Sequence, residues 1–192
     1  MKRREIWGVA LLLAAAVVTG GGLGLHVADR AAADQGLLLY IGVRASNVVY
    51  GLMIVASFLA AAGLLLVVPS LIGRIPKKIL RRTVGWMTGL AAAAALPFLG
   101  IVLIFAILGA VGIGDDVKVA AADGQSVLLV QDGFDGDTVD IYTLHDDLHY
   151  QWARRADELG GWPRVKDQDC QLHSDATGLQ LTCGAQKVAI GQ

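Results

Sequence analysis

Four aspartates crowd one short, glycine-rich segment of this chain, DGFDGDTVD at residues 132–140. They are Asp132, Asp135, Asp137 and Asp140. Carboxylates gathered on a Gly-rich loop are the oxygen ligands that Ca²⁺ prefers, so the segment is a candidate cation-binding site. The EF-hand pattern is absent, because its glycine is misplaced and no predicted helices flank the segment. Asp and Gly are also the usual residues of hairpin turns, which is the competing interpretation.

A second polar cluster, HDDLH, places His145 and His149 around two aspartates. Imidazole and carboxylate together can bind Zn²⁺ or Cu²⁺, although a turn with exposed polar residues explains the same letters.

Catalysis has less support. His173 and Ser174 are adjacent on a predicted strand, so their side chains point to opposite faces. No nucleophile elbow, phosphate loop or metalloprotease helix is present, and we expect neither enzymatic activity nor a cofactor other than Ca²⁺.

The only cysteines of the chain are Cys170 and Cys183. If residues 169–184 form an antiparallel hairpin, one register places Cys170 directly opposite Cys183. The same register places Leu172 opposite Leu181, so that cysteines and leucines share one face. Directly opposed residues have Cα atoms ~4.5–5.5 Å apart, within or near the disulfide range. The sequence therefore predicts a disulfide, with two buried free thiols as the alternative.

These residues belong to a C-terminal segment, 115–192, that reads as a small antiparallel β-meander. From Val117 onward, short β-rich runs alternate with turn signals, of which Asp123-Gly124 is the strongest. We expect its aromatic residues to form the core, with an aromatic binding surface as the alternative. The expected strands are 117–122, 127–131, 138–144, 148–153 and the two arms of the hairpin, and the aromatic residues are Tyr150, Trp152 and Trp162.

Three uncharged apolar runs precede this domain, at about 6–25, 49–73 and 86–113. Each reaches the ~20 residues that a helix needs to cross a hydrocarbon core. The predicted fold class is therefore three transmembrane helices (1–114) followed by the β domain. None of the three runs has an ionisable side chain at its centre, which argues against a pump or an ion-coupled transporter. Small residues at four-residue spacing predict close helix packing, within the chain or in a dimer; they are Ala16, Gly20 and Gly24.

The flanking charges predict the orientation. Residues 1–114 carry 10 basic and 3 acidic residues, whereas 115–192 carry 6 basic and 14 acidic ones. Lys and Arg crowd the N-terminus and the short loop Arg74–Thr83, which are therefore expected in the cytoplasm, with the acidic domain outside it. An acidic domain disfavours nucleic acid as a partner. Alternatively the first run is a cleaved signal peptide, ending near Ala31–Ala33, although its apolar stretch is long for one.

The connection between the first two runs contains an apolar segment, Gly36–Val43. We expect it to lie along the outer membrane interface or above it, with Tyr40 and Arg44 as anchors. The alternative is an apolar patch that binds a partner.

Together these features indicate a multi-pass protein of the cell membrane. The leading hypothesis is a non-enzymatic accessory or scaffold subunit that presents its β domain to a membrane or envelope protein. The alternative is a sensor that binds a cation or small ligand outside and signals through a membrane partner. An enzyme with an unrecognised site is the third hypothesis.

Overall fold

The structure, a computed structural model, describes residues 3–111, 114–133, 136–175 and 178–190. Its contacts divide the chain into two units. We call them the helical unit (Met1–Leu25 with Val48–Ala110) and the β unit (His26–Asn47 with Val111–Gln192). The predicted boundary at residue 114 did not assign the connection 26–47 to the β region.

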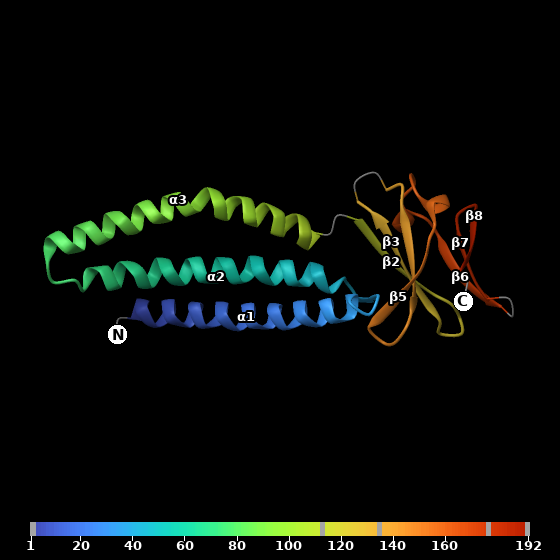
Figure 1. Cartoon of the computed structure of the whole chain (residues 1–192), viewed down its shortest axis with the longest axis horizontal. Coiled ribbons are helices and arrows are strands. Elements are labelled where there is room, and N and C mark those ends of the chain that lie inside the picture. Colours follow the sequence, from blue (N-terminus) through green and yellow to red (C-terminus); the bar gives the residue numbers. More distant parts are fainter. Residues whose placement is uncertain (1–2, 112–113, 134–135, 176–177, 191–192) are drawn as a thin grey trace. The chain divides into compact units, whose positions relative to one another are not determined.

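Three long helices confirm the three predicted apolar elements: α1 (Arg3–Ala33), α2 (Ala45–Gly73) and α3 (Lys78–Val111) (Figure 1). All three are long and apolar enough to cross a membrane, by length and composition. They extend past the apolar runs because alanine, lysine and arginine at their ends are good helix formers. Pro69 and Pro97 lie inside α2 and α3.

Within the helical unit, α1 and α2 approach closely at two glycines. A Cβ added at Gly8 would lie 2.6 Å from Val67 Cγ2, and one added at Gly63 would lie 2.8 Å from Leu12 Cγ. One turn away, the buried Glu5 carboxylate accepts hydrogen bonds from the Ser70 hydroxyl and the Arg74 guanidinium. These contacts join the first turns of α1 to the last turns of α2.

The small residues Ala16, Gly20 and Gly24 do not take part in this crossing. Ala16 is exposed, and a Cβ added at Gly20 or Gly24 would meet no described atom within 4 Å. The packing inside the chain therefore uses other glycines. We call Ala16, Gly20 and Gly24 the small-residue stripe, and its packing against a second chain stays a prediction.

The β unit holds two antiparallel sheets. The larger has the order β1-β5-β4-β3-β2 and the smaller the order β6-β7-β8. Their strands are β1 (Leu37–Leu39), β2 (Gly114–Ala120), β3 (Ser126–Asp132), β4 (Val139–Leu144), β5 (His149–Arg155), β6 (Cys170–Asp175), β7 (Gly178–Cys183) and β8 (Gln186–Ile190). Short 3₁₀ turns at Asp157–Leu159 and Val165–Asp167 connect β5 to β6. The meander was predicted, whereas β1, β8 and the split into two sheets were not.

Strand β1 lies in the connection that was expected at the membrane interface. Leu37–Leu39 pairs with Gln151–His149 at the edge of the larger sheet, and its position relative to a membrane stays a prediction. The Tyr40 ring packs edge-on against Tyr150, with 5.8 Å between centroids. Arg44 Nε donates to Asp116 Oδ2 at 2.8 Å. The apolar segment thus satisfies its backbone by extending the sheet, and the connection is a structural part of the β unit.

The core lies between the two sheets. Val127, Leu129 and Ile141 of the larger sheet pack with Leu181 and Val188 of the smaller one. Of the expected aromatic core only Tyr150 is buried, at 1% exposed, whereas Trp152 and Trp162 are 52% and 77% exposed. The Trp152 indole N–H donates to Asp140, and the Trp162 ring stacks under the Arg164 guanidinium. Polar partners at the surface thus replace burial for both tryptophans.

Candidate functional site

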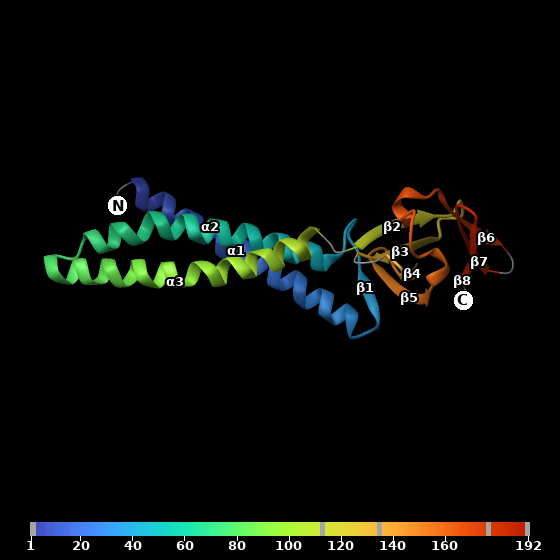
Figure 2. The same cartoon turned by 90° about the horizontal axis from the view of Figure 1, so that it is seen from above.

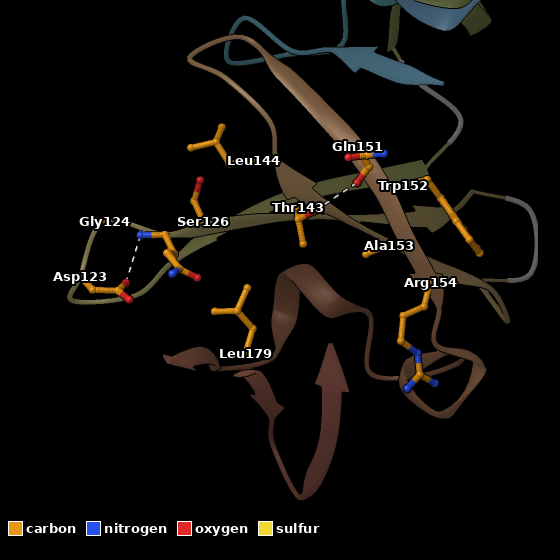
Figure 3. A pocket seen from close by; sticks show the side chains of 11 residues that line it. Asp123, Gly124, Ser126, Thr143, Leu144, Gln151, Trp152, Ala153, Arg154 and Leu179 are labelled. Carbon is orange, nitrogen blue, oxygen red and sulfur yellow. Dashed lines mark hydrogen bonds between the residues drawn. The ribbon is translucent and has the colours of Figure 1, made fainter. Parts of the chain in front are cut away.

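A pocket of about 850 Å³ opens between the two sheets of the β unit (Figure 3). Its residues come from the β2–β3 turn, from β3, β4 and β5, and from the start of β7. They are Asp123, Gly124, Gln125, Ser126, Thr143, Leu144, Gln151, Trp152, Ala153, Arg154 and Leu179.

The register of the larger sheet explains why the pocket lies here. Val127, Thr143 and Gln151 form one row across β3, β4 and β5, and so share a face. Val127 is fully buried in the core, Thr143 is half-buried and Gln151 is exposed. The smaller sheet therefore covers only the β3 end of this row. The uncovered end presents a hydroxyl and an amide.

Two charged residues border the pocket, and both are held in place. Asp123 accepts the Gln125 backbone N–H at 3.1 Å, and this bond and one from the Ser174 hydroxyl lower the pKa of the Asp123 carboxyl. The Arg154 guanidinium donates to Glu158 at 2.7 Å and to the Ala189 carbonyl at 3.2 Å. The pocket thus offers fixed charges and neutral hydrogen-bonding groups, which suits recognition of a polar ligand.

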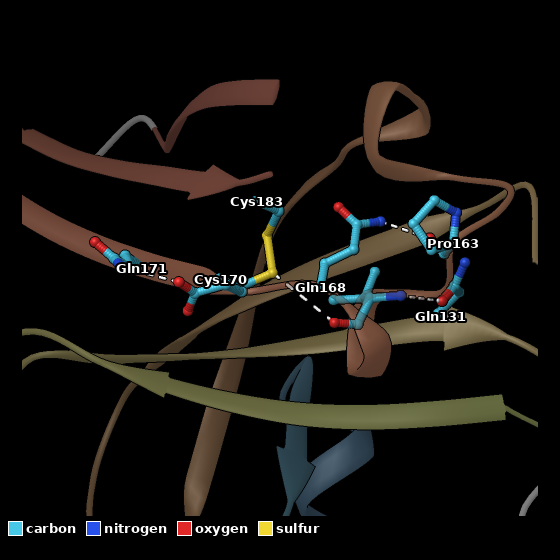
Figure 4. Close-up of a disulfide and its surroundings, with 8 residues drawn as sticks. Gln131, Pro163, Gln168, Cys170, Gln171 and Cys183 are labelled. Carbon is cyan, nitrogen blue, oxygen red and sulfur yellow. Dashed lines mark hydrogen bonds between the residues drawn. A yellow bond between two sulfur atoms is a disulfide. The ribbon is translucent and has the colours of Figure 1, made fainter. Parts of the chain in front are cut away.

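Gln131 organises the loops beside the smaller sheet, and sequence analysis missed it. Its side chain is 1% exposed. Its Nε2 donates to the Gly136 and Gly161 carbonyls at 2.7 and 3.2 Å. Its Oε1 accepts the Val165 N–H at 2.8 Å, the bond drawn at Gln131 in Figure 4. A signal was available, because Gln131 follows Val127 and Leu129 at period two and so falls on the core face.

A cluster of three charged side chains connects the same loops by ion pairs. Asp115 pairs with Arg164 and Lys166, each at 2.9 Å, and Arg164 also donates to the Gly133 carbonyl at 3.1 Å. Burial raises the pKa of the Asp115 carboxyl, but hydrogen bonds from the two cations outweigh this and lower the pKa overall.

The four aspartates of the candidate Ca²⁺ site have different surroundings. Asp140 accepts Arg155 Nε at 3.1 Å and the Trp152 indole at 3.3 Å. Asp132 and Asp137 each have an interaction of their own. Asp135 lies outside the described residues. Within the described ranges, no three His, Cys, Asp or Glu side chains come together as a metal-binding group, and the cation site stays a prediction.

The HDDLH segment forms the turn between β4 and β5. Asp146 Oδ1 accepts the backbone N–H groups of Leu148 and His149 at 3.0 and 2.9 Å, and contacts His149 Nδ1 at 2.8 Å. These bonds, the one from Leu148 first, lower the pKa of Asp146 to about 2. His145 donates its backbone N–H to the His149 carbonyl. The geometry supports the turn interpretation; a metal held by His145 and His149 stays a prediction.

The predicted hairpin has the predicted register and disulfide. Cys170 faces Cys183 and Leu172 faces Leu181, and the two cysteines are bonded, with Cα atoms 4.1 Å apart (Figure 4). Because Cys183 is fully buried in the core cluster, the disulfide supports packing between the sheets rather than chemistry at the surface.

Comparisons of the chain with models of protein families, with curated proteins and with solved structures find no match.

Proposed function

We propose that this chain is a non-enzymatic membrane protein whose β unit, outside the cytoplasm, presents the pocket between its sheets to a protein partner. It acts as an accessory or scaffold subunit. The observation that carries the proposal is the pocket of about 850 Å³ between the sheets, bordered by Gln151 and Arg154. Its size lies within the range of ligand sites, and Arg is one of the residue types that dominate binding energy at protein interfaces.

The charge state of the pocket favours binding over catalysis. Asp123 is the one carboxylate among the described residues that line it, and the pKa of Asp123 is lowered. A general acid needs the opposite shift, toward the working pH. Arg154 is already paired with Glu158, so it supplies shape and a fixed dipole more than a free charge.

The charge distribution and the disulfide support the orientation. The basic residues flank the helices at the N-terminus and the Arg74–Thr83 loop, which favours a cytoplasmic position for both. Disulfides persist outside the cytoplasm, which fits the β unit. The proposed partners are the lipid bilayer and a membrane or envelope protein. Nucleic acid is disfavoured by the acidic β unit.

Site-specific photo-crosslinking in living cells tests this function. A crosslinking amino acid replaces Gln151, an exposed residue of the pocket, and in a matched control replaces Gln180, an exposed residue of β7 outside it. We expect one discrete protein adduct from position 151, weakened by Arg154→Ala, and none from position 180. Equal labelling from both positions would contradict a partner in the pocket.

The sensor is the second candidate, because the pocket is linked to the connection between two helices. Gln151 of the pocket pairs with Leu37 of β1. The end of α1 at Ala33 and the start of α2 at Ala45 lie only a few residues from β1 along the chain. A ligand that displaces β5 would therefore displace β1 and, through it, the end of α1 and the start of α2. Spin labels on α1 and α2 whose distance does not respond to a pocket ligand would remove this candidate.

A further inference from the structure

Basic residues gather at one end of the helical unit. The bond of 2.5 Å between Arg74 and Glu5 brings the start of α1 beside the end of α2, so that the N-terminal end of α1 and the α2–α3 turn lie at the same end (Figures 1 and 2). The basic residues there are all exposed: Arg3, Arg4, Arg74, Lys77, Lys78, Arg81 and Arg82.

This basic end has almost no countercharge. Glu5 is the one acidic residue near it in the sequence, and its carboxylate already accepts bonds from Ser70 and Arg74. No ion pair among the described residues involves the other six cations. Their mutual repulsion is therefore not relieved by the described part of the chain.

The cations also stand where the helices themselves are positive. Both α1 and α3 begin at this end, at Arg3 and Lys78. The first turn of a helix carries unpaired N–H groups and a partial positive charge, which stabilises anions and destabilises cations. A topology signal depends on the number of Lys and Arg residues near a span, not on their position in a first turn. An anion from outside the chain would therefore stabilise Lys78 and Arg81 in the first turn of α3.

Two exposed tryptophans set the depth at which that anion would lie. Trp7 of α1 is 60% exposed and Trp86 of α3 is 65% exposed, and each follows the basic residues by about one turn of helix. Tryptophan prefers the level of the lipid headgroups at a membrane surface. The neighbouring cations then lie at the level of the lipid phosphates.

We propose that this basic end is a binding site for the phosphate groups of anionic phospholipids. Arg81 and Arg82 are suited to bidentate contacts with phosphate, and the first turn of α3 adds its dipole. The ligand chemistry, a phosphate monoester or diester, is shared with free phosphate. We commit to the lipid because the helices on which these residues stand place them at a layer of lipid headgroups. This inference is independent of the function proposed for the pocket.

Quenching of tryptophan fluorescence by brominated lipids tests the site. The full chain is reconstituted into vesicles of phosphatidylcholine with brominated phosphatidylglycerol or brominated phosphatidylcholine, and the relative association of the two lipids is measured. We expect phosphatidylglycerol to be preferred roughly fivefold or more at low ionic strength, since a single cation near the surface already contributes about a fivefold factor. The preference should fall in Arg81→Gln with Arg82→Gln. It should fall less in Arg81→Lys with Arg82→Lys, which keeps the charges but loses the bidentate contacts. It should persist in the control Lys118→Gln with Lys187→Gln.

Three results would overturn the inference. The first is equal association of the two lipids with the unsubstituted chain, a measurement that depends on no variant. The second is an unchanged preference in the Gln variant that still inserts. The third is loss of the preference on adding inorganic phosphate, but not chloride at the same ionic strength, which would assign the site to free phosphate instead of lipid.

Discussion

The two units of this chain place their apolar side chains in opposite surroundings. In the helical unit, large apolar side chains such as Leu13, Phe58 and Phe105 are exposed, and close approach is confined to a few places such as Gly8 and Gly63. In the β unit, apolar side chains are buried between sheets, and polar groups such as Gln131 find partners inside. The helices thus depend on what surrounds the chain, whereas the β unit depends on its own contacts.

The largest effect tests whether the β unit includes the helix connection. Residues 114–192 alone lack β1, Tyr40 and Arg44, and so leave Tyr150 uncovered and Asp116 unpaired. We expect this fragment to show no cooperative unfolding. The same fragment with residues 26–47 joined through a flexible linker should unfold cooperatively, as followed by circular dichroism. Equal transitions in both would show that the connection is dispensable.

The next effect concerns the buried polar centre. Gln131→Ala removes three hydrogen bonds and leaves the Val165 N–H and the Gly161 carbonyl without this partner, whereas the Gly136 carbonyl keeps its bond from the Gly161 N–H. Because each buried unsatisfied group costs about 1–3 kcal/mol, we expect a loss of roughly 3–4 kcal/mol in the free energy of unfolding of the full chain. The control Gln125→Ala, at an exposed turn, should change stability little. A similar small loss in both variants would place Gln131 outside the stabilising network.

The disulfide closes a short loop, because its cysteines are 13 positions apart in the sequence. The chain-entropy model then gives roughly 3 kcal/mol for replacing both cysteines by Ser. We expect this loss in the unfolding of the β unit, with the helices of the helical unit unchanged. Thiol labelling of the denatured, unreduced chain is the direct measurement. Two reactive thiols per chain would refute the bond.

A smaller effect separates two glycines of the helical unit. Gly63→Ala would press a methyl group against Leu12, whereas Gly20→Ala would meet no described atom. Overpacking costs about 1–3 kcal/mol, so we expect Gly63→Ala to weaken the α1–α2 crossing and Gly20→Ala to leave it unchanged. Crosslinking between cysteines placed on α1 and α2 reports the difference. Weakening by Gly20→Ala instead would indicate a second packing partner for the stripe.

The smallest effect is a pH dependence at the β4–β5 turn. The pKa of Asp146 falls from 3.8 to about 2 on folding, through bonds from Leu148 and His149. A lowered pKa stabilises the fold above the unfolded value, and this contribution disappears as the pH falls from about 4 to about 2. Asp146→Asn should remove that part of the pH dependence of unfolding, and Asp147→Asn serves as the charge-matched control. Identical pH profiles for the unsubstituted chain and Asp146→Asn would contradict the turn geometry.

Elements whose signal is local could be predicted from the sequence. The three apolar helices follow from hydropathy, and the register of Cys170 and Cys183 follows from alternation and a short turn. Strand β1 could not be predicted, because Leu37–Leu39 reads equally as an interfacial segment until its partner β5 is known. The pocket was missed for the same reason, since it joins residues of one sheet to Leu179 of the other.

The position of β1 also constrains the order in which this chain can be completed. Leu37 pairs with Gln151, 114 positions later, and the whole of α2 and α3 is synthesised between them. The edge of the larger sheet therefore stays unpaired during synthesis until the third helix has been made and β5 has emerged. Contacts so distant in sequence form slowly, and an unpaired edge is prone to wrong pairing. Biogenesis of this protein should therefore be most vulnerable after the helices have been made and before closure of the sheet, when Leu37–Leu39 is available to chaperones or to the same segment of another nascent chain.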